Sequence, residues 1–96
     1  MYYVYVLKSE KDEKLYTGYT NNLRRRFAEH TTGKSASVRF RLPIHLVYYE
    51  EYMSQADAVA RESRLKTSQG ARTALKRRLR NSLRQGHFSV TGDNFS

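Results

Sequence analysis

Arg26 and His30 are residues whose types and spacing suit chemistry on a phosphate ester. The guanidinium of an arginine is a permanently charged planar fork that can bond two phosphate oxygens at once. His30 follows one helical turn later and could act as a proton acceptor or a phosphate ligand, with an ordinary core or surface histidine as the alternative. Arg24 and Arg25 precede Arg26 directly, and the local composition does not separate the three. An ordinary solvated helix arginine is therefore the competing interpretation of Arg26.

Glu62 is the one anion in a strongly basic stretch, residues 61–84. That stretch has nine lysine and arginine residues, so it carries a net charge of +8 out of the +9 of the whole chain. A carboxylate is a hard oxygen ligand, and one or two carboxylates with water and phosphate are enough to hold Mg²⁺. The alternative is a surface ion pair with Arg61, Lys66 or Arg72, worth only ~0.3–0.5 kcal/mol. The residues alone leave both interpretations open.

The chain has eight tyrosines, and most of them are expected to pack in strands with the hydroxyl at the rim. Tyr5 and Tyr16 differ from the others because each stands in a second pattern of residues, and a tyrosine there could order or deprotonate an attacking water. A tyrosine with a pKa near 10 is a poor base unless neighbouring cations lower that pKa. Gly18 contributes no packing inside a strand-like segment, which indicates a close approach of backbone or ligand.

Three segments have the composition of strands, at residues 2–8, 15–20 and 44–51. The first is nearly continuous in its apolarity, which is typical of a central strand buried on both faces. The polar residues 9–14 are expected to form the connecting turn of a hairpin between the first two strands.

Helices are expected over residues 23–30, after the N-cap candidates Asn21 and Asn22, over 54–67, which opens on a capping box, and over 71–83. In the last helix Leu75, Leu79 and Leu83 form a narrow apolar stripe. Residues 31–43 are expected to form a loop.

The order β-β-α-β-α-α predicts an α+β fold with a small three-stranded antiparallel or mixed sheet flanked by helices. We expect a single domain over residues 1–84 and a polar tail over 85–96.

The composition of the 96 residues excludes several classes of protein. The absence of cysteine excludes a disulfide framework and zinc modules that need cysteine. No run approaches the ~20 apolar residues of a membrane span, and no secretory signal is visible, so a cytoplasmic protein is expected. A concentrated positive charge indicates a nucleic-acid partner, with a merely solvated basic face or an anionic membrane surface as alternatives.

Several of these residues form an ordered pattern with defined spacings. Tyr3-Val4-Tyr5 is followed after ten residues by Tyr16-Thr17-Gly18, and Arg26 comes eight residues after that glycine. The pattern resembles the GIY-YIG nuclease family, especially its small stand-alone members related to the nuclease module of excinuclease. Both tyrosines and the last glycine of the two motifs are retained, and Tyr3 replaces the first glycine. The resemblance continues through residues 46–50 and 58–66 and spans nearly the whole chain.

The resemblance implies a GIY-YIG-like fold and a metal-dependent DNA endonuclease with low intrinsic sequence specificity. The catalytic residues that it implies are Tyr5, Tyr16, Arg26 and His30. It also implies that Glu62 holds one Mg²⁺ or Mn²⁺ ion, bound when substrate is present and acting as a Lewis acid on the leaving oxygen. Many members carry an asparagine twelve to fifteen residues after the metal-binding glutamate, whereas residues 74–77 contain none here.

The basic residues outside the motif are expected to bind nucleic-acid phosphates. They are Arg24, Arg25, Lys66, Arg72, Lys76, Arg77 and Arg78. Gly18 is expected to let a backbone or phosphate approach. The expected partner is DNA, in branched, damaged or single-stranded form, and RNA is left open. Two alternatives have the same basic face: a nucleic-acid-binding module that does not cut, and a structural or partner-binding domain.

Overall fold

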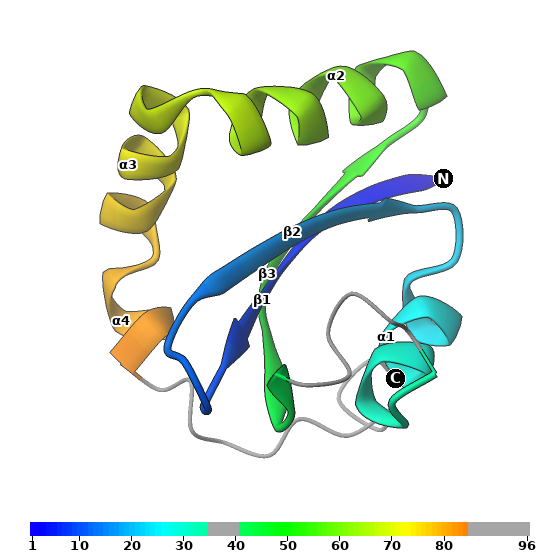
Figure 1. Ribbon diagram of the computed structural model, residues 1–96. Helices are drawn as coiled ribbons and strands as arrows, with labels where there is room; N and C mark the ends of the chain where they lie inside the picture. Colours follow the sequence, from blue (N-terminus) through cyan, green and yellow to red (C-terminus); the bar gives the residue numbers. More distant parts are fainter. Residues whose placement is uncertain (35–40, 85–96) are drawn as a thin grey trace.

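Three strands form one antiparallel sheet in the computed structural model, which describes residues 1–34 and 41–84. The strands are β1 (Tyr2–Ser9), β2 (Leu15–Thr20) and β3 (Ile44–Tyr52), and their order in the sheet is β2-β1-β3 (Figure 1). The nearly continuous apolar segment β1 is the central strand, as expected of a strand that is covered on both faces. This confirms the predicted fold class and places β2 and β3 at the two edges of the described sheet.

Side chains of β1 alternate between two apolar clusters, one on each face of the sheet. Val4 and Val6 pack with residues of the helices that follow β3. Tyr5 and Leu7 pack with Phe27 of the helix that follows β2. Since successive residues of a strand point to opposite faces, a single strand supplies both halves of the core.

The helices are α1 (Leu23–Thr31), α2 (Gln55–Thr67), α3 (Gln69–Arg78) and α4 (Arg80–Arg84). Helix α1 lies on one side of the sheet, whereas α2, α3 and α4 lie on the other (Figure 1). The side chain of Asn22 accepts a hydrogen bond from the amide of Arg25 at 3.0 Å, and Ser54 accepts one from that of Asp57 at 3.4 Å. These N-caps fix the start of α1 and α2.

The structure divides the single helix expected over residues 71–83 into α3 and α4. Ser68 caps the amide of Ala71 at 3.1 Å, so α3 begins at Gln69, two residues earlier than expected. The helix ends at Arg78, and the amide of the C-cap residue Leu79 donates to the carbonyls of both Leu75 and Lys76. Because the chain turns there, Leu79 is buried and Leu83 packs against the same cluster. The three leucines of the stripe therefore pack on one apolar cluster as predicted, but they do so from two short helices and the turn between them.

A cluster around Glu50 ties α2 to β3. The Glu50 carboxylate accepts hydrogen bonds from the hydroxyls of Tyr48 at 2.6 Å and Tyr52 at 2.5 Å, and from Arg61 Nε at 3.0 Å. Charge-assisted bonds of this kind hold both partners in one geometry. Arg61 directly precedes Glu62, so the cluster fixes the turn of α2 that carries Glu62.

Two sequence predictions fall partly or wholly outside the described residues. They are the centre of the predicted loop, residues 35–40, and the predicted tail, 85–96. Among the helices within residues 1–34 and 41–84, none is long and apolar enough to cross a membrane.

Candidate active site

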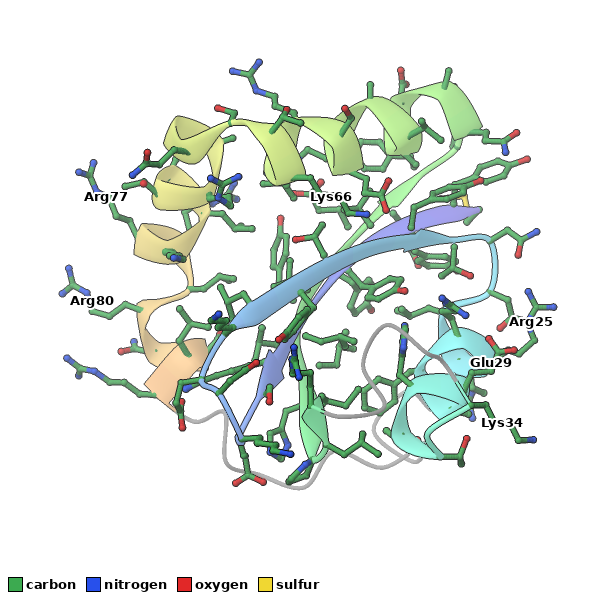
Figure 2. All side chains as sticks on the ribbon, viewed as in Figure 1. Arg25, Glu29, Lys34, Lys66, Arg77 and Arg80 are labelled. Atoms are coloured by element: carbon green, nitrogen blue, oxygen red, sulfur yellow. The ribbon has the colours of Figure 1, made fainter. Side chains whose placement is uncertain are left out.

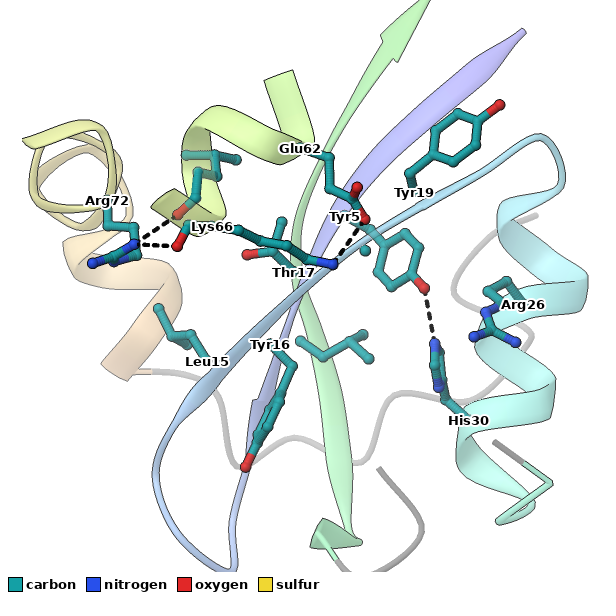
Figure 3. A pocket seen from close by; sticks show the side chains of 13 residues that line it. Tyr5, Leu15, Tyr16, Thr17, Tyr19, Arg26, His30, Glu62, Lys66 and Arg72 are labelled. Carbon is teal, nitrogen blue, oxygen red and sulfur yellow. Dashed lines mark hydrogen bonds and ion pairs between the residues drawn. The ribbon is translucent and has the colours of Figure 1, made fainter. Parts of the chain in front are cut away.

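A pocket of about 570 Å³ opens around the edge strand β2, between α1 and α2 (Figure 3). Because β2 is an edge strand, side chains from both faces of the sheet meet around it. The predicted site residues that line the pocket are Tyr5, Tyr16, Gly18, Arg26, His30, Glu62, Lys66 and Arg72. They come from β1, β2, α1, α2 and α3, and thus from residues far apart in the sequence.

The ring of Tyr5 lies directly across Gly18. The two residues are cross-strand partners of β1 and β2, and Tyr5 is only 4% exposed. A Cβ atom at Gly18 would lie 2.3 Å from both Cζ and the hydroxyl oxygen of Tyr5. The sequence predicted that a backbone, ligand or phosphate approaches Gly18, whereas in the structure the ring of Tyr5 makes a close approach there. The glycine lets the Tyr5 hydroxyl reach the pocket.

The Tyr5 hydroxyl shares a hydrogen bond of 2.9 Å with Nε2 of His30. His30 is 3% exposed, and burial, followed by the positive charge of Arg26, lowers its pKa to about 4. The imidazole is therefore neutral at neutral pH. Its Nδ1 has no hydrogen-bond partner among the described residues. If Nδ1 carries the proton, Nε2 is free to accept the proton of Tyr5.

Arg26 lies beside the Tyr5 hydroxyl and forms an ion pair with Glu29 at 3.3 Å. Its side chain is 37% exposed, so the guanidinium keeps access to solvent and to the pocket. Burial raises the pKa of Tyr5 and outweighs the opposing effect of Arg26, while Glu62 and Glu29 act in the same upward direction as burial. The expected lowering of this pKa by a nearby cation is present but smaller than the effect of burial. Tyr5 is a neutral phenol at neutral pH.

Glu62 points from α2 toward the same pocket. Its side chain is 22% exposed, and one carboxylate oxygen lies 3.2 Å from Nζ of Lys66 on the next turn. Figure 3 shows the Glu62 carboxylate above β2, on the opposite side of that strand from Arg26 and His30. Both interpretations of Glu62 thus have support, since it forms a helix-surface ion pair and also faces the pocket.

Comparison with known proteins adds to this geometry. The model of the GIY-YIG catalytic domain matches residues 1–77. The chain belongs to the GIY-YIG family. Its relatives include two UPF0213 proteins, each aligned over 67 residues. The one from Staphylococcus haemolyticus is 46% identical, over 69% of this chain and 80% of the relative. The one from Natronomonas pharaonis is 49% identical, over 69% and 78%.

A solved structure shows the same fold. The solution NMR structure of a UPF0213 protein from Bacillus halodurans superposes with a TM-score of 0.56 at 28% identity, covering 95% of this chain and 100% of that one. The family membership predicted from the two tyrosine motifs is therefore confirmed. Because the family match covers residues 1–77, every residue that lines the pocket, including Arg72 of α3, lies within the matched segment.

The donor set of this GIY-YIG domain fits one of the ways in which proteins bind a divalent cation. No cluster of three or more histidine or acidic residues that could hold a metal occurs in the described part of the chain. Glu62 is the acidic residue that lines the pocket there. Mg²⁺ often binds through one carboxylate together with water and substrate phosphate. A single, partly exposed glutamate beside an open pocket fits that mode, but it does not fit a closed protein cage.

Tyr16 makes hydrogen bonds that the sequence did not predict. Its hydroxyl donates to Asp12 at 2.5 Å and accepts from Nε of Arg41 at 2.8 Å, and Arg41 also pairs with Asp12 at 3.1 Å. Burial and the bond to Asp12 raise the pKa of Tyr16. Asp12 could have been suspected from its place in the hairpin loop four residues before Tyr16. Arg41 gave no signal, since it lies 25 residues away in the predicted loop.

The seven basic residues expected to bind phosphate lie on several faces of the GIY-YIG domain. Lys66 and Arg72 line the pocket, and Arg72 also donates to the carbonyl of Lys66 at 2.8 Å, which caps the end of α2. Figure 2 shows Lys66 below α2, toward the sheet, and Arg77 pointing away from it. Arg24 and Arg25 are exposed on α1, and Lys76 and Arg78 lie on α3. Only part of the basic stretch therefore faces the site.

Burial of His30 predicts a pH dependence of stability. Its pKa is about 4 in the folded chain and about 6.5 in the unfolded chain, so between these values the unfolded state binds more protons. As the pH drops from 6.5 to 4, protonation of His30 in the unfolded chain should lower the free energy of unfolding by about 3 kcal/mol. Urea unfolding at several pH values should show a flatter profile for His30→Gln than for the parent. Equal slopes over this range would contradict the burial of a neutral His30.

Proposed function

We propose that this protein is a divalent-metal-dependent DNA endonuclease that hydrolyses phosphodiester bonds with little intrinsic sequence specificity. The observation that carries the proposal is the convergence of Tyr5, His30, Arg26 and Glu62 on one pocket. Hydrolysis of a phosphodiester needs an oriented water, stabilisation of charge on the phosphoryl oxygens, and help for the leaving oxygen. The four side chains supply groups suited to these three tasks.

Arg26 is assigned to the phosphoryl oxygens. Its guanidinium is permanently charged, is partly exposed to the pocket and lies beside the Tyr5 hydroxyl. A planar fork can bond two oxygens of the scissile phosphate as negative charge develops on them. Arg26 also lines the pocket while its Nη1 donates to Glu29 one turn later at 3.3 Å.

Tyr5 and His30 are assigned to the attacking water. The oxygen of water forms the new bond to phosphorus as the bond to the leaving oxygen breaks. Its proton passes to the Tyr5 oxygen, and the proton of Tyr5 passes to Nε2 of His30 across the 2.9 Å hydrogen bond. A neutral imidazole can accept that proton, and the negative phosphate favours the resulting imidazolium. Tyr16 is assigned a supporting role, since its hydroxyl is held by Asp12 and Arg41.

Glu62 is the residue that would hold the Mg²⁺ or Mn²⁺ ion. A bound divalent cation would supply Lewis-acid stabilisation of the leaving oxygen. For this role Lys66, which lies 3.2 Å from the carboxylate, must release it. The ammonium of Lys66 would then be available to a phosphate at the rim of the pocket.

The Glu62–Lys66 ion pair also favours a second candidate, a nucleic-acid-binding module that does not cut. In that case Glu62 only orders Lys66 on the surface of α2. Such a module would show salt-dependent binding without metal-dependent strand cleavage.

The test is nicking of supercoiled, branched and single-stranded DNA by Glu62→Gln, with and without Mg²⁺. We expect the parent to require Mg²⁺ and the variant to cut at least about 100-fold more slowly. DNA affinity in EDTA should be retained or slightly increased, because the variant loses one negative charge.

Asp57→Asn is the matched control, because it removes an exposed carboxylate from the first turn of the same helix. It should cut like the parent. Cleavage by Glu62→Gln at the parental rate would overturn the metal assignment. An absence of cleavage by the parent on every substrate, with salt-dependent binding retained, would favour the non-cutting module.

A further inference from the structure

A second pocket of about 570 Å³ lies beside the candidate active site. Leu15, Thr17, Leu65 and Arg72 line both pockets. The two therefore form one continuous groove along the edge strand β2, toward α3 and α4. Arg72 and Leu15 mark the shared part on the left of Figure 3.

Leucines form an apolar floor in the second pocket. The side chains of Leu15, Leu65, Leu75 and Leu83 line it, and Leu65 and Leu75 also belong to the buried core. Pockets of a few hundred Å³ with an apolar lining and a few polar groups at the rim are typical ligand sites. This volume suits one or two nucleotides and is too small for a base-paired duplex.

The rim of the second pocket is positively charged. It contains Lys8, Lys14, Arg72 and Lys76, with Glu13 as the one acid among its described lining residues. Glu13 is 3.1 Å from Nζ of Lys8, which also donates to the carbonyl of Leu83. Arg72 is engaged by the carbonyls at the end of α2. The ammonium groups of Lys14 and Lys76 have no ion pair within residues 1–34 and 41–84, so both are available to an anion.

We propose that this second pocket binds one unpaired nucleotide of the strand whose scissile phosphate lies in the candidate active site. Its base lies on the leucine floor, and Lys14 and Lys76 hold its phosphates. The inference rests on the proposed function and narrows the substrate class to single-stranded or locally unpaired nucleic acid. An apolar floor and two rim lysines without an ion pair among the described residues complement the apolar face of a base and its anionic backbone.

The test is fluorescence anisotropy in EDTA, so that binding is read without cleavage. The probes are a labelled 12-residue oligothymidylate and a labelled 12-base-pair duplex. Lys76→Glu should weaken binding of the oligothymidylate about tenfold or more, and the neighbouring Arg77→Glu by about threefold or less. Both variants change the charge of α3 equally, but Arg77 points away from the sheet (Figure 2). The two variants should weaken duplex binding to the same extent.

A second pair of variants makes the same comparison in the hairpin loop. Lys14→Glu should reproduce the loss seen with Lys76→Glu, whereas Lys11→Glu, at an exposed position outside the pocket, should not. Equal effects of pocket and control variants on the oligothymidylate would overturn the proposal, because only the total charge would then matter. No binding of the oligothymidylate by the parent would overturn it as well.

An abasic strand tests the leucine floor separately from the cationic rim. A 12-residue strand with the same phosphates but without bases should bind the parent about tenfold more weakly than the oligothymidylate. Equal affinity for the two strands would overturn the base-binding pocket. If the parent cuts DNA with Mg²⁺ but its binding affinity is unaffected by the pocket substitutions and by removal of the bases, only this inference fails. If Glu62→Gln cuts like the parent but the binding pattern holds, the proposed metal-dependent chemistry fails instead.

Discussion

Replacing Arg26 by alanine is expected to lower kcat for DNA cleavage about 1,000-fold, equivalent to about 4 kcal/mol of transition-state stabilisation. The guanidinium lies at the mouth of the pocket beside the Tyr5 hydroxyl, where negative charge on the phosphoryl oxygens would develop. Its loss also removes the group that lowers the pKa of Tyr5. Single-turnover cleavage of a saturating labelled substrate in Mg²⁺ measures the effect on the chemical step.

Arg25→Ala is the matched control, since it removes the same side chain one residue earlier. Arg25 is exposed, and its Nη2 donates a hydrogen bond to the Asn21 side chain at 3.4 Å. It should keep kcat within about twofold of the parent and slightly weaken DNA affinity, as loss of one surface cation would. Arg26→Lys should recover only a small part of the activity, because an ammonium cannot bond two oxygens as a planar fork does. If Arg25→Ala and Arg26→Ala lose activity equally, Arg26 contributes only charge.

Most of the fold could be predicted from local sequence patterns. The apolar run of β1 identified the central strand, because a strand covered on both faces has no polar side. Asn22 and Ser54 marked the starts of α1 and α2 through their capping side chains. These features depend only on residues close together in the sequence, so they can be predicted from the sequence. The break at Leu79 was not predicted, because it depends on where the end of the sheet lies relative to α3.

The membership of the site was easier to predict than its hydrogen bonds. The resemblance to the GIY-YIG family predicted Tyr5, Arg26, His30 and Glu62 as site residues, and the structure places all four around one pocket. The 2.9 Å bond between Tyr5 and His30 joins residues 25 positions apart and depends on how α1 packs on the sheet. The Asp12–Tyr16–Arg41 contacts likewise depend on tertiary packing. No pattern in a single sequence specifies such contacts.

The position of β2 at an edge of the sheet explains why Glu62, Arg26 and His30 line one pocket. In a strand, side chains of one face are separated from those of the other by the backbone. At the edge strand β2 only one backbone intervenes, so Glu62 above it and Arg26 and His30 below it line the same pocket (Figure 3). Gly18 has no side chain, so β2 leaves room for the Tyr5 ring where that ring crosses the strand.

Gly18→Ala should therefore damage both stability and activity. The new Cβ would lie 2.3 Å from Cζ and the hydroxyl oxygen of Tyr5 and 2.8 Å from its Cε2, so the ring must move. Tyr5 is buried with Leu7 and Phe27, and its hydroxyl bonds His30, so movement disrupts packing and this hydrogen bond together. We expect a loss of about 1–3 kcal/mol in the free energy of unfolding and at least about 100-fold in cleavage. Urea unfolding and single-turnover cleavage measure the two effects.

Gly70→Ala is the control for the substitution itself. Gly70 lies in α3, and a Cβ there would meet only the Ser68 hydroxyl at an ordinary 3.8 Å. Alanine is favoured over glycine within a helix, and Gly70 lies in the first turn of α3, so the free energy of unfolding of this variant should rise by up to about 1 kcal/mol. The same chemical change is thus expected to act with opposite sign at the two glycines.

A double-mutant cycle between Gly18 and Tyr5 assigns the cause of the loss. In a Tyr5→Leu background the far end of the ring is absent, so Gly18→Ala should cost about 0.5 kcal/mol or less. In a Tyr5→Phe background Cζ remains, and most of the cost should persist although the bond to His30 is gone. An undiminished cost of Gly18→Ala in the Tyr5→Leu protein would show that the edge strand needs glycine for its own backbone. A cost that vanishes there would show that glycine is required at this position so that Tyr5 can cross the sheet edge to the pocket.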